Sequence, residues 1–240
     1  MANKFYVPGE ERAARVSDLF ASIATRYDLL NDFMSFGLHR RWKRRVIALA
    51  APAPGMRALD LCCGTGDLAF ALAARGAEVT GLDFSEAMLA VAAQRNEKTD
   101  AAHRPKFLRG DALALPFPDA SFDLVTIGYG LRNLADCAGG LREMRRVLRP
   151  GGRLLVLDFG KPPNPLWRRM YFAHLKYITP LPGRLMGKEI ATYAYIYESL
   201  QHYPAQTGVA QILGELGFAE VQVINLLGGI MSIHNARREG

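Results

Sequence analysis

The residues whose types and spacing most directly indicate ligand binding are a glycine turn and three aspartates. The first apolar run after the N-terminal segment contains Asp60 and breaks into Gly64 and Gly66, and a helical pattern starts immediately afterwards. Glycines let backbone N–H groups approach a ligand closely, and the following helix directs its positive end toward it. Asp83 and Asp111 end the next two apolar stretches. We therefore expect a cradle for the ribose and adenine of an adenosine ligand.

The charge of the ligand separates two kinds of cofactor. The spacing of Gly64, Gly66 and Ala69 also fits the loose fingerprint of a dinucleotide site, which would bind a nicotinamide cofactor. Asp60 and Asp111 would repel the phosphates of a dinucleotide, because like charges repel. S-adenosylmethionine has a cationic sulfonium, an ammonium group and no phosphate. The charges therefore favour S-adenosylmethionine.

This interpretation gives each residue of the turn a role. Asp83 is predicted to accept hydrogen bonds from both ribose hydroxyls, and Asp111 and Ala112 to lie beside the adenine. The predicted cofactor site is completed around the methionine part by Asp60, Gly64, Thr65 and Gly66.

From residue 56 onward, apolar stretches alternate with helical patterns, which is typical of a parallel sheet with helices on both faces. We predict seven strands, at 57–63, 78–83, 106–110, 122–128, 153–159, 220–226 and 230–236. Helices are expected at about 67–75, from the N-cap Ser85 to about Lys98, at 137–148 and at 207–216. The last two strands are close in sequence, so the last is expected to be antiparallel. The predicted class is α/β with a Rossmann-like sheet.

Two segments lie outside this alternation. Residues 10–35 have helical periodicity, 28–36 are expected to turn the chain, and a second helix is expected at about 39–50. Residues 161–206 are rich in proline and aromatic side chains and are interpreted as a helical insertion covering the active site. We predict one domain over 1–240, with a helical cap (1–55), a core (56–160 and 207–240) and this insertion (161–206).

Composition and charge exclude several classes of protein. Three cysteines without paired spacing favour a reducing, cytoplasmic compartment and no metal. No apolar run is long enough to span a bilayer. The net charge is +7, to which 1–55 and 161–206 contribute +4 each and 207–240 contributes −1, while 56–160 is neutral. This distribution indicates an anionic partner, either a membrane or a nucleic acid, with ordinary solubilising charge as the simple alternative.

The region after the fourth strand argues against a nucleic-acid substrate. Methyltransferases acting on nucleic-acid amines have an Asn/Asp-Pro-Pro-aromatic motif there, whereas this chain has Gly128 to Asn133, and its Pro162 to Pro165 run follows the fifth strand. Cys62 and Cys63 are interpreted as buried strand residues rather than nucleophiles. We expect no nucleic-acid partner, and a catalytically silent S-adenosylmethionine-binding module stays an alternative.

Several stretches, spread over nearly the whole chain, resemble one methyltransferase family more specifically than the glycine turn does. They are residues 26–40 with 42–44, 59–68, 114–119, 130–133 and 149–157. In these stretches the chain resembles the ubiquinone/menaquinone biosynthesis C-methyltransferases, which methylate a ring carbon of a polyprenylated quinol. The glycine motif is common to many methyltransferases, but 27–40 and the Gly-Leu-Arg-Asn of 130–133 are specific to this family.

The resemblance implies a class I S-adenosylmethionine-dependent methyltransferase fold with Thr65, Asp83, Asp111 and Ala112 at the cofactor. Many members have a serine where this chain has Gly128. The family covers benzoquinol and naphthoquinol substrates. The Cys62-Cys63 pair and the Tyr-Ile-Thr-Pro-Leu run at 177–181 are similar to menaquinone and phylloquinone members, which favours demethylmenaquinol as the substrate.

Carbon methylation requires electron density on the ring, which an ionised quinol hydroxyl supplies. With a pKa of about 10, that ionisation costs roughly 4 kcal/mol at pH 7. We predict that the fixed charge of Arg132 lowers this cost and that Asn133 orients the hydroxyl. A structural ion pair is the alternative role for Arg132. The base is water, His174 or His202.

The substrate sets the remaining expectations. Tyr27, Phe36 and His174 are predicted to contact the quinol. A polyprenyl chain resides in the bilayer, so we expect peripheral contact with anionic lipid on the inner face of the cytoplasmic membrane. Residues 40–45 and 167–169, which are basic and aromatic, are the predicted contact segments. Homo-oligomerisation stays open.

Overall fold

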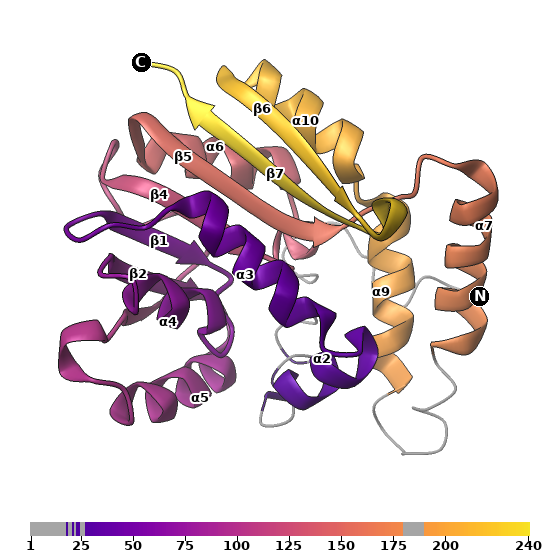
Figure 1. Ribbon diagram of the computed structural model, residues 1–240, viewed down its shortest axis with the longest axis horizontal. Coiled ribbons are helices and arrows are strands. Elements are labelled where there is room, and N and C mark those ends of the chain that lie inside the picture. Colours follow the sequence, from indigo (N-terminus) through magenta and orange to yellow (C-terminus); the bar gives the residue numbers. More distant parts are fainter. Residues whose placement is uncertain (1–17, 19–20, 22, 25–26, 180–189) are drawn as a thin grey trace.

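One seven-stranded sheet forms the centre of the protein (Figure 1). The computed structural model describes residues 18, 21, 23–24, 27–179 and 190–240. The strands are β1 (Arg57–Leu61), β2 (Glu78–Asp83), β3 (Lys106–Arg109), β4 (Phe122–Gly128), β5 (Leu148–Phe159), β6 (Phe218–Leu226) and β7 (Met231–Arg238). Their order in the sheet is β3-β2-β1-β4-β5-β7-β6. β7 runs antiparallel to β5 and β6, and the other pairs are parallel, so the predicted α/β sheet is confirmed.

Helices cover both faces of the sheet. Side chains of a strand point alternately to opposite faces, and here the side chains on both faces are apolar and need to be buried. On β5, Leu155 and Leu157 pack into a core shared with α3 (Leu38–Ala50) and α4 (Asp67–Ala73). Leu154 and Val156 pack into the other core, shared with α6 (Cys137–Val147) and α10 (Ala205–Glu215). α5 (Glu86–Glu97) packs against β2 and β3, and Ser85 caps it as predicted, accepting a hydrogen bond from Met88 N.

The described residues between β5 and α10 add no strand to the sheet. They form α7 (Pro165–Ala173), a π-helical turn η4 (His174–Ile178) and α9 (Ile190–His202), and these lie past the carboxyl end of β5 (Figure 1). Residues 180–189 of the predicted insertion lie outside the described residues. No helix in the described part of the chain is long and apolar enough to cross a membrane.

Two boundaries differ from the sequence-based expectation. Residues 28–36 do not turn the chain, because α2 (Tyr27–Ser35) includes most of them and the turn is confined to Phe36 and Gly37, both at positive φ. The part of the predicted 10–35 helix before residue 18 lies outside the described residues. β5 begins at Leu148 rather than at 153, since the Pro-Gly-Gly run forms an irregular bulge within the strand, with Gly151 at a φ of 75° and a register shift against β4 between Phe122 and Leu124.

Candidate functional site

The loop after β1 adopts backbone conformations that few side chains tolerate. Cys62, Gly64 and Gly66 have φ angles of 49°, 56° and 90°. A Cβ at Gly66 would lie 2.8 Å from the ring of Phe70 and 2.9 Å from that of Phe107, so only glycine fits there. The loop therefore brings main chain, rather than bulky side chains, to a cavity at the carboxyl edge of the sheet.

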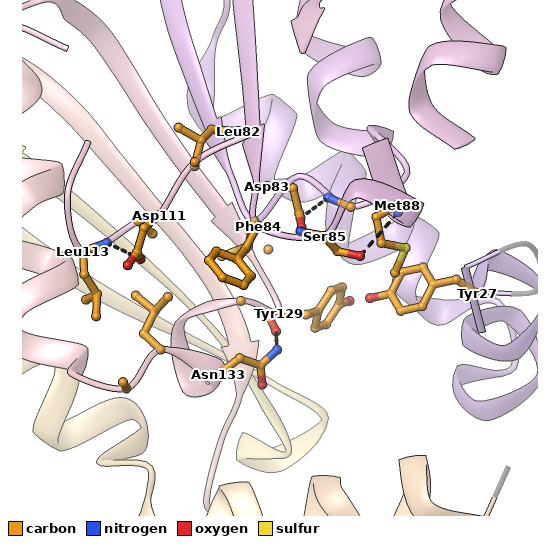
Figure 2. A pocket seen from close by; sticks show the side chains of 18 residues that line it. Tyr27, Leu82, Asp83, Phe84, Ser85, Met88, Asp111, Leu113, Tyr129 and Asn133 are labelled. Atoms are coloured by element: carbon orange, nitrogen blue, oxygen red, sulfur yellow. Dashed lines mark hydrogen bonds between the residues drawn. The ribbon is translucent and has the colours of Figure 1, made fainter. Parts of the chain in front are cut away.

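That cavity has a volume of about 850 Å³, including its open mouth, and lies at the carboxyl ends of β1, β2 and β4 (Figure 2). We call it the larger pocket. Its lining combines the glycine loop, the end of β2, the loop after β3 and the loop after β4. The residues are Tyr27, Cys62, Gly64, Leu82, Asp83, Phe84, Ser85, Met88, Gly110, Asp111, Ala112, Leu113, Gly128, Tyr129, Gly130, Asn133, Leu134 and Ala135. Most of this wall is apolar, with carboxylates at two points.

Asp83 is held rigidly at the end of β2. Its Oδ2 accepts a hydrogen bond of 2.8 Å from Gly64 N and its Oδ1 one of 2.8 Å from Ser85 N. Burial raises the pKa of Asp83, and these two backbone hydrogen bonds oppose the effect. Each carboxylate oxygen has two lone pairs, so both keep capacity for a ligand hydroxyl. Asp83 thus links the glycine loop to the larger pocket.

Asp111 and Ala112 lie in the loop after β3, on the other side of the larger pocket. Asp111 Oδ1 accepts a hydrogen bond of 2.9 Å from Leu113 N, which fixes the loop, and Ala112 is buried. The predicted pair therefore faces the same cavity as Asp83.

A smaller, more polar cavity adjoins the larger one, and we call it the smaller pocket. It is lined by Tyr27, Lys43, Asp60, Cys62, Cys63, Gly64, Thr65, Asp67, Leu68, Gly128 and Tyr129. Asp60 is 1% exposed, and its Oδ1 accepts a hydrogen bond of 2.7 Å from Thr126 Oγ1. Burial raises the pKa of Asp60 to about 7, so this carboxyl titrates near neutrality. A nearby ligand cation would favour its charged form.

An ion-pair network joins the N-terminal helices to the glycine loop. Lys43 Nζ lies 2.6 Å from Asp67 Oδ2, and Arg95 contacts Asp67 Oδ1 at 2.8 Å. Burial alone would raise the pKa of Asp67, but Lys43 and Arg95 lower it to about 2. Asp28 accepts hydrogen bonds from Thr65 Oγ1 at 3.0 Å and from Arg95 at 3.3 Å. The network holds α2 and α3 against the glycine loop and α5.

The residues predicted to contact substrate do not all lie together. Tyr27 lines both pockets. Phe36 does not, because its side chain is 92% exposed in the turn between α2 and α3. His174 is also exposed, at the start of η4, and lines neither pocket. The geometry therefore does not support Phe36 and His174 as pocket walls.

Asn133 lines the larger pocket, whereas its neighbour Arg132 does not. Arg132 is buried and contacts Asp158 Oδ1 at 2.8 Å, while its backbone N–H donates to Asp158 Oδ2. The guanidinium also donates to Tyr129 O at 2.5 Å and lies 4.6 Å from the ring centre of Phe159. Asp158 thus neutralises the charge that was predicted to stabilise a phenolate, and the geometry favours the structural alternative.

Sequence reasoning missed three features of the site. Tyr129 follows β4 and lines both pockets, and Lys43 reaches the smaller pocket from α3. Tyr195 of α9 donates a hydrogen bond of 2.9 Å to Asn133 Oδ1. The position of Tyr129 directly after a strand was a usable signal. Lys43 was concealed within a basic cluster, and the Tyr195 contact joins residues far apart in sequence.

The sheet order, the glycine loop after β1 and the acidic end of β2 define the class of protein: a class I, Rossmann-like methyltransferase fold. Solved structures agree. A phosphoethanolamine N-methyltransferase 2 from Haemonchus contortus, in complex with S-adenosylhomocysteine, matches with a TM-score of 0.64 and 18% identity over 83% of this chain and 53% of that one. A S-adenosylmethionine-dependent methyltransferase from Aquifex aeolicus matches with a TM-score of 0.58 and 18% identity over 81% of this chain and 88% of that one.

The chain belongs to the ubiE/COQ5 methyltransferase family, whose model matches residues 9–238. A ubiquinone/menaquinone biosynthesis C-methyltransferase from Ectopseudomonas mendocina is 42% identical over 95% of this chain and 90% of its own length. The protein of that name from Shewanella frigidimarina is 40% identical over 95% and 92%. A demethylmenaquinone methyltransferase from Desulfitobacterium hafniense is 39% identical over 96% and 92%. The predicted family is thus confirmed.

Proposed function

We propose that this chain transfers the methyl group of S-adenosylmethionine to a ring carbon of a polyprenylated quinol, converting demethylmenaquinol to menaquinol. The observation that carries the proposal is the pair of adjoining pockets that share Gly64 at the carboxyl edge of the sheet. The larger pocket, with Asp83 on one side and Asp111 and Ala112 on the other, takes the adenosyl group. The smaller pocket, with Asp60 and Thr65, takes the charged methionine end.

Transfer to carbon requires an electron-rich ring placed in line with the sulfonium methyl. Bound S-adenosylmethionine would supply the methyl group to the ring carbon and leave as the thioether S-adenosylhomocysteine, and the proton displaced from the ring would pass to water. Asn133 is the side chain best placed to orient the quinol oxygen. Its Oδ1 accepts from Tyr195 and its Nδ2 donates to Tyr129 O at 3.2 Å. Nδ2 has a second N–H, which is available to stabilise a developing phenolate.

Arg132 contributes to this arrangement by positioning. Its guanidinium joins the carbonyl of Tyr129 to the carboxylate of Asp158, so it fixes the loop that carries Asn133. A fixed loop maintains the near-attack geometry on which such a transfer depends.

The named relatives support a quinol substrate and include both a demethylmenaquinone enzyme and ubiquinone/menaquinone enzymes. The test is transfer of a labelled methyl group from S-adenosylmethionine to short-chain demethylmenaquinol, with the benzoquinol precursor and tRNA as competing acceptors. We expect the naphthoquinol to be methylated on carbon. Labelling of tRNA alone would contradict the proposal, and labelling of the benzoquinol alone would correct the substrate.

Membrane contact is proposed for one surface beyond the carboxyl end of β5. Exposed apolar side chains gather on α7, η4 and the adjoining 3-10 turn η5 (Leu227–Gly229), which we call the α7 surface. They are Leu166, Trp167, Met170, Tyr177, Ile178 and Leu227. Trp167 Nε1 donates to Leu227 O at 3.4 Å, which joins the two segments. Exposed Arg168, Arg169 and Lys176 flank them. Apolar side chains beside basic ones match an anionic bilayer.

The other predicted contact segment, residues 40–45, is partly used within the fold. Arg40 pairs with Asp32 and Lys43 with Asp67. We therefore place the membrane contact on the α7 surface.

Reversing two charges of that surface tests the assignment. We expect Arg168→Glu with Arg169→Glu to lower association with vesicles containing anionic lipid by tenfold or more, since each basic residue near the surface contributes about 1 kcal/mol. The matched control is Arg75→Glu with Arg142→Glu, which makes the same charge change at exposed positions elsewhere. Vesicle co-sedimentation at two salt concentrations measures the effect. An equal loss in both double variants would contradict the assignment.

A further inference from the structure

Tyr129 lies where the larger and smaller pockets meet. Five residues line both pockets: Tyr27, Cys62, Gly64, Gly128 and Tyr129. Two of them are glycines, and burial raises the pKa of the Cys62 thiol well above its usual value. The tyrosine hydroxyls therefore supply the strongest side-chain hydrogen-bonding groups at this junction.

The hydroxyl of Tyr129 is unusual for a buried polar group. Its oxygen is buried and has no hydrogen-bond partner among the residues that the structure describes. In Figure 2 the hydroxyl oxygens of Tyr129 and Tyr27 point toward each other. Burial also raises the pKa of Tyr129 well above its usual value, so the hydroxyl keeps its proton and can donate. A buried donor without an acceptor destabilises the free protein, and a ligand acceptor would relieve this.

The backbone holds this side chain in a fixed and uncommon conformation. Tyr129 has a φ angle of 62°, which non-glycine residues rarely adopt and which recurs at ligand sites. Its N–H donates to Leu157 O at 2.7 Å, and its carbonyl accepts from Arg132 and Asn133. The ring is therefore directed to the junction by contacts on both sides of its peptide.

A cation approaches the same point from α3. Lys43 Nζ lies 5.9 Å from the centre of the Tyr129 ring and lines the smaller pocket. One of its three donors is directed to Asp67. An ammonium group and a neutral hydroxyl donor that converge on one cavity are complementary to a carboxylate. Asp60, across the same pocket, is complementary to an ammonium group.

We propose that the Tyr129 hydroxyl and Lys43 Nζ bind the α-carboxylate of S-adenosylmethionine. The inference rests on the proposed function, because it requires the adenosyl group in the larger pocket. It makes Tyr129 a cofactor-binding residue, and it gives the orphan hydroxyl its partner only in the cofactor complex.

Ligands that differ in the amino-acid end test the assignment. S-adenosylhomocysteine carries the α-carboxylate, whereas 5′-methylthioadenosine keeps the adenosyl thioether without it. We expect Tyr129→Phe to weaken S-adenosylhomocysteine and S-adenosylmethionine about tenfold each, or about 1.4 kcal/mol, by calorimetry. Binding of 5′-methylthioadenosine should be unchanged. Lys43→Gln should show the same selectivity.

The matched control is Tyr203→Phe. The Tyr203 hydroxyl is also buried without a described partner, but Tyr203 lines neither pocket, so its removal should change no affinity. Equal weakening of all three ligands by Tyr129→Phe would overturn the inference, as would no weakening or weakening of S-adenosylmethionine alone. If the unmodified chain binds none of the ligands, the proposed function itself fails.

Discussion

Replacing Arg132 with alanine is expected to lower the free energy of unfolding by about 3–5 kcal/mol, because it leaves a buried carboxylate without its partner. Asp158 is 0% exposed and Arg132 5% exposed, with 2.8 Å between their charged atoms. The variant also removes the donor that holds the carbonyl of Tyr129. This loss would be a large fraction of the stability of an ordinary domain.

Denaturant unfolding of Arg132→Ala measures this effect, and Arg149→Ala provides the matched control. Arg149 pairs with Asp123 at 2.7 Å, but the two side chains are 43% and 31% exposed. An exposed pair of this kind contributes about 0–1 kcal/mol. Removing Asp158 as well should recover part of the loss, since the unpaired charge goes with it. If Arg132→Ala unfolds like the unmodified chain yet loses turnover, the direct catalytic role first predicted for Arg132 would be restored.

Arg132 was predicted to stabilise a phenolate, but in the structure it pairs with Asp158. This difference shows which features of a structure can be predicted from a single stretch of sequence. β2 and β4 were predicted at their observed bounds because short β-branched and apolar stretches bounded by turn residues can be recognised in the sequence alone. The glycine loop was predictable for the same reason. Asp158 lies 26 residues beyond Arg132, and only the parallel pairing of β4 with β5 brings the two together. Pairing between strands is not encoded in any one stretch.

The residues predicted for the cofactor therefore meet at the two adjoining pockets, whereas those predicted for the substrate do so only in part. Asp83 and Asp111 follow their own strands, so their place at the sheet edge is a consequence of topology. The predicted walls Phe36 and His174 belong to turns flanking the core, and the direction of a side chain there depends on packing between helices. Lys43 illustrates the converse, since its basic neighbours suggested a surface role while its own ammonium contacts Asp67.

Replacing Asp83 with alanine is expected to weaken binding of S-adenosylhomocysteine by about 100-fold or more. In the proposed complex, Asp83 accepts hydrogen bonds from both ribose hydroxyls, and each bond to a charged group contributes about 1.5–3 kcal/mol. The substitution also removes the acceptor of Gly64 N and Ser85 N, so the glycine loop loses its tie to β2. Both consequences act on the larger pocket.

Asp83→Asn should weaken binding of S-adenosylhomocysteine nearly as much as Asp83→Ala does. Because asparagine has almost the same volume as aspartate, this result would separate the hydrogen-bonding role from a simple loss of volume. Both carboxylate oxygens accept backbone N–H groups, and an amide would present a donor to one of them. Asp100→Ala is the matched control, because Asp100 also accepts a backbone hydrogen bond, from Ala102 N, but is 74% exposed and lines neither pocket. Calorimetry gives the affinities, and circular dichroism shows whether each variant is folded. A folded Asp83→Ala variant that binds S-adenosylhomocysteine within threefold of the unmodified chain would place the ribose elsewhere, because in the proposed complex Asp83 accepts both ribose hydroxyls.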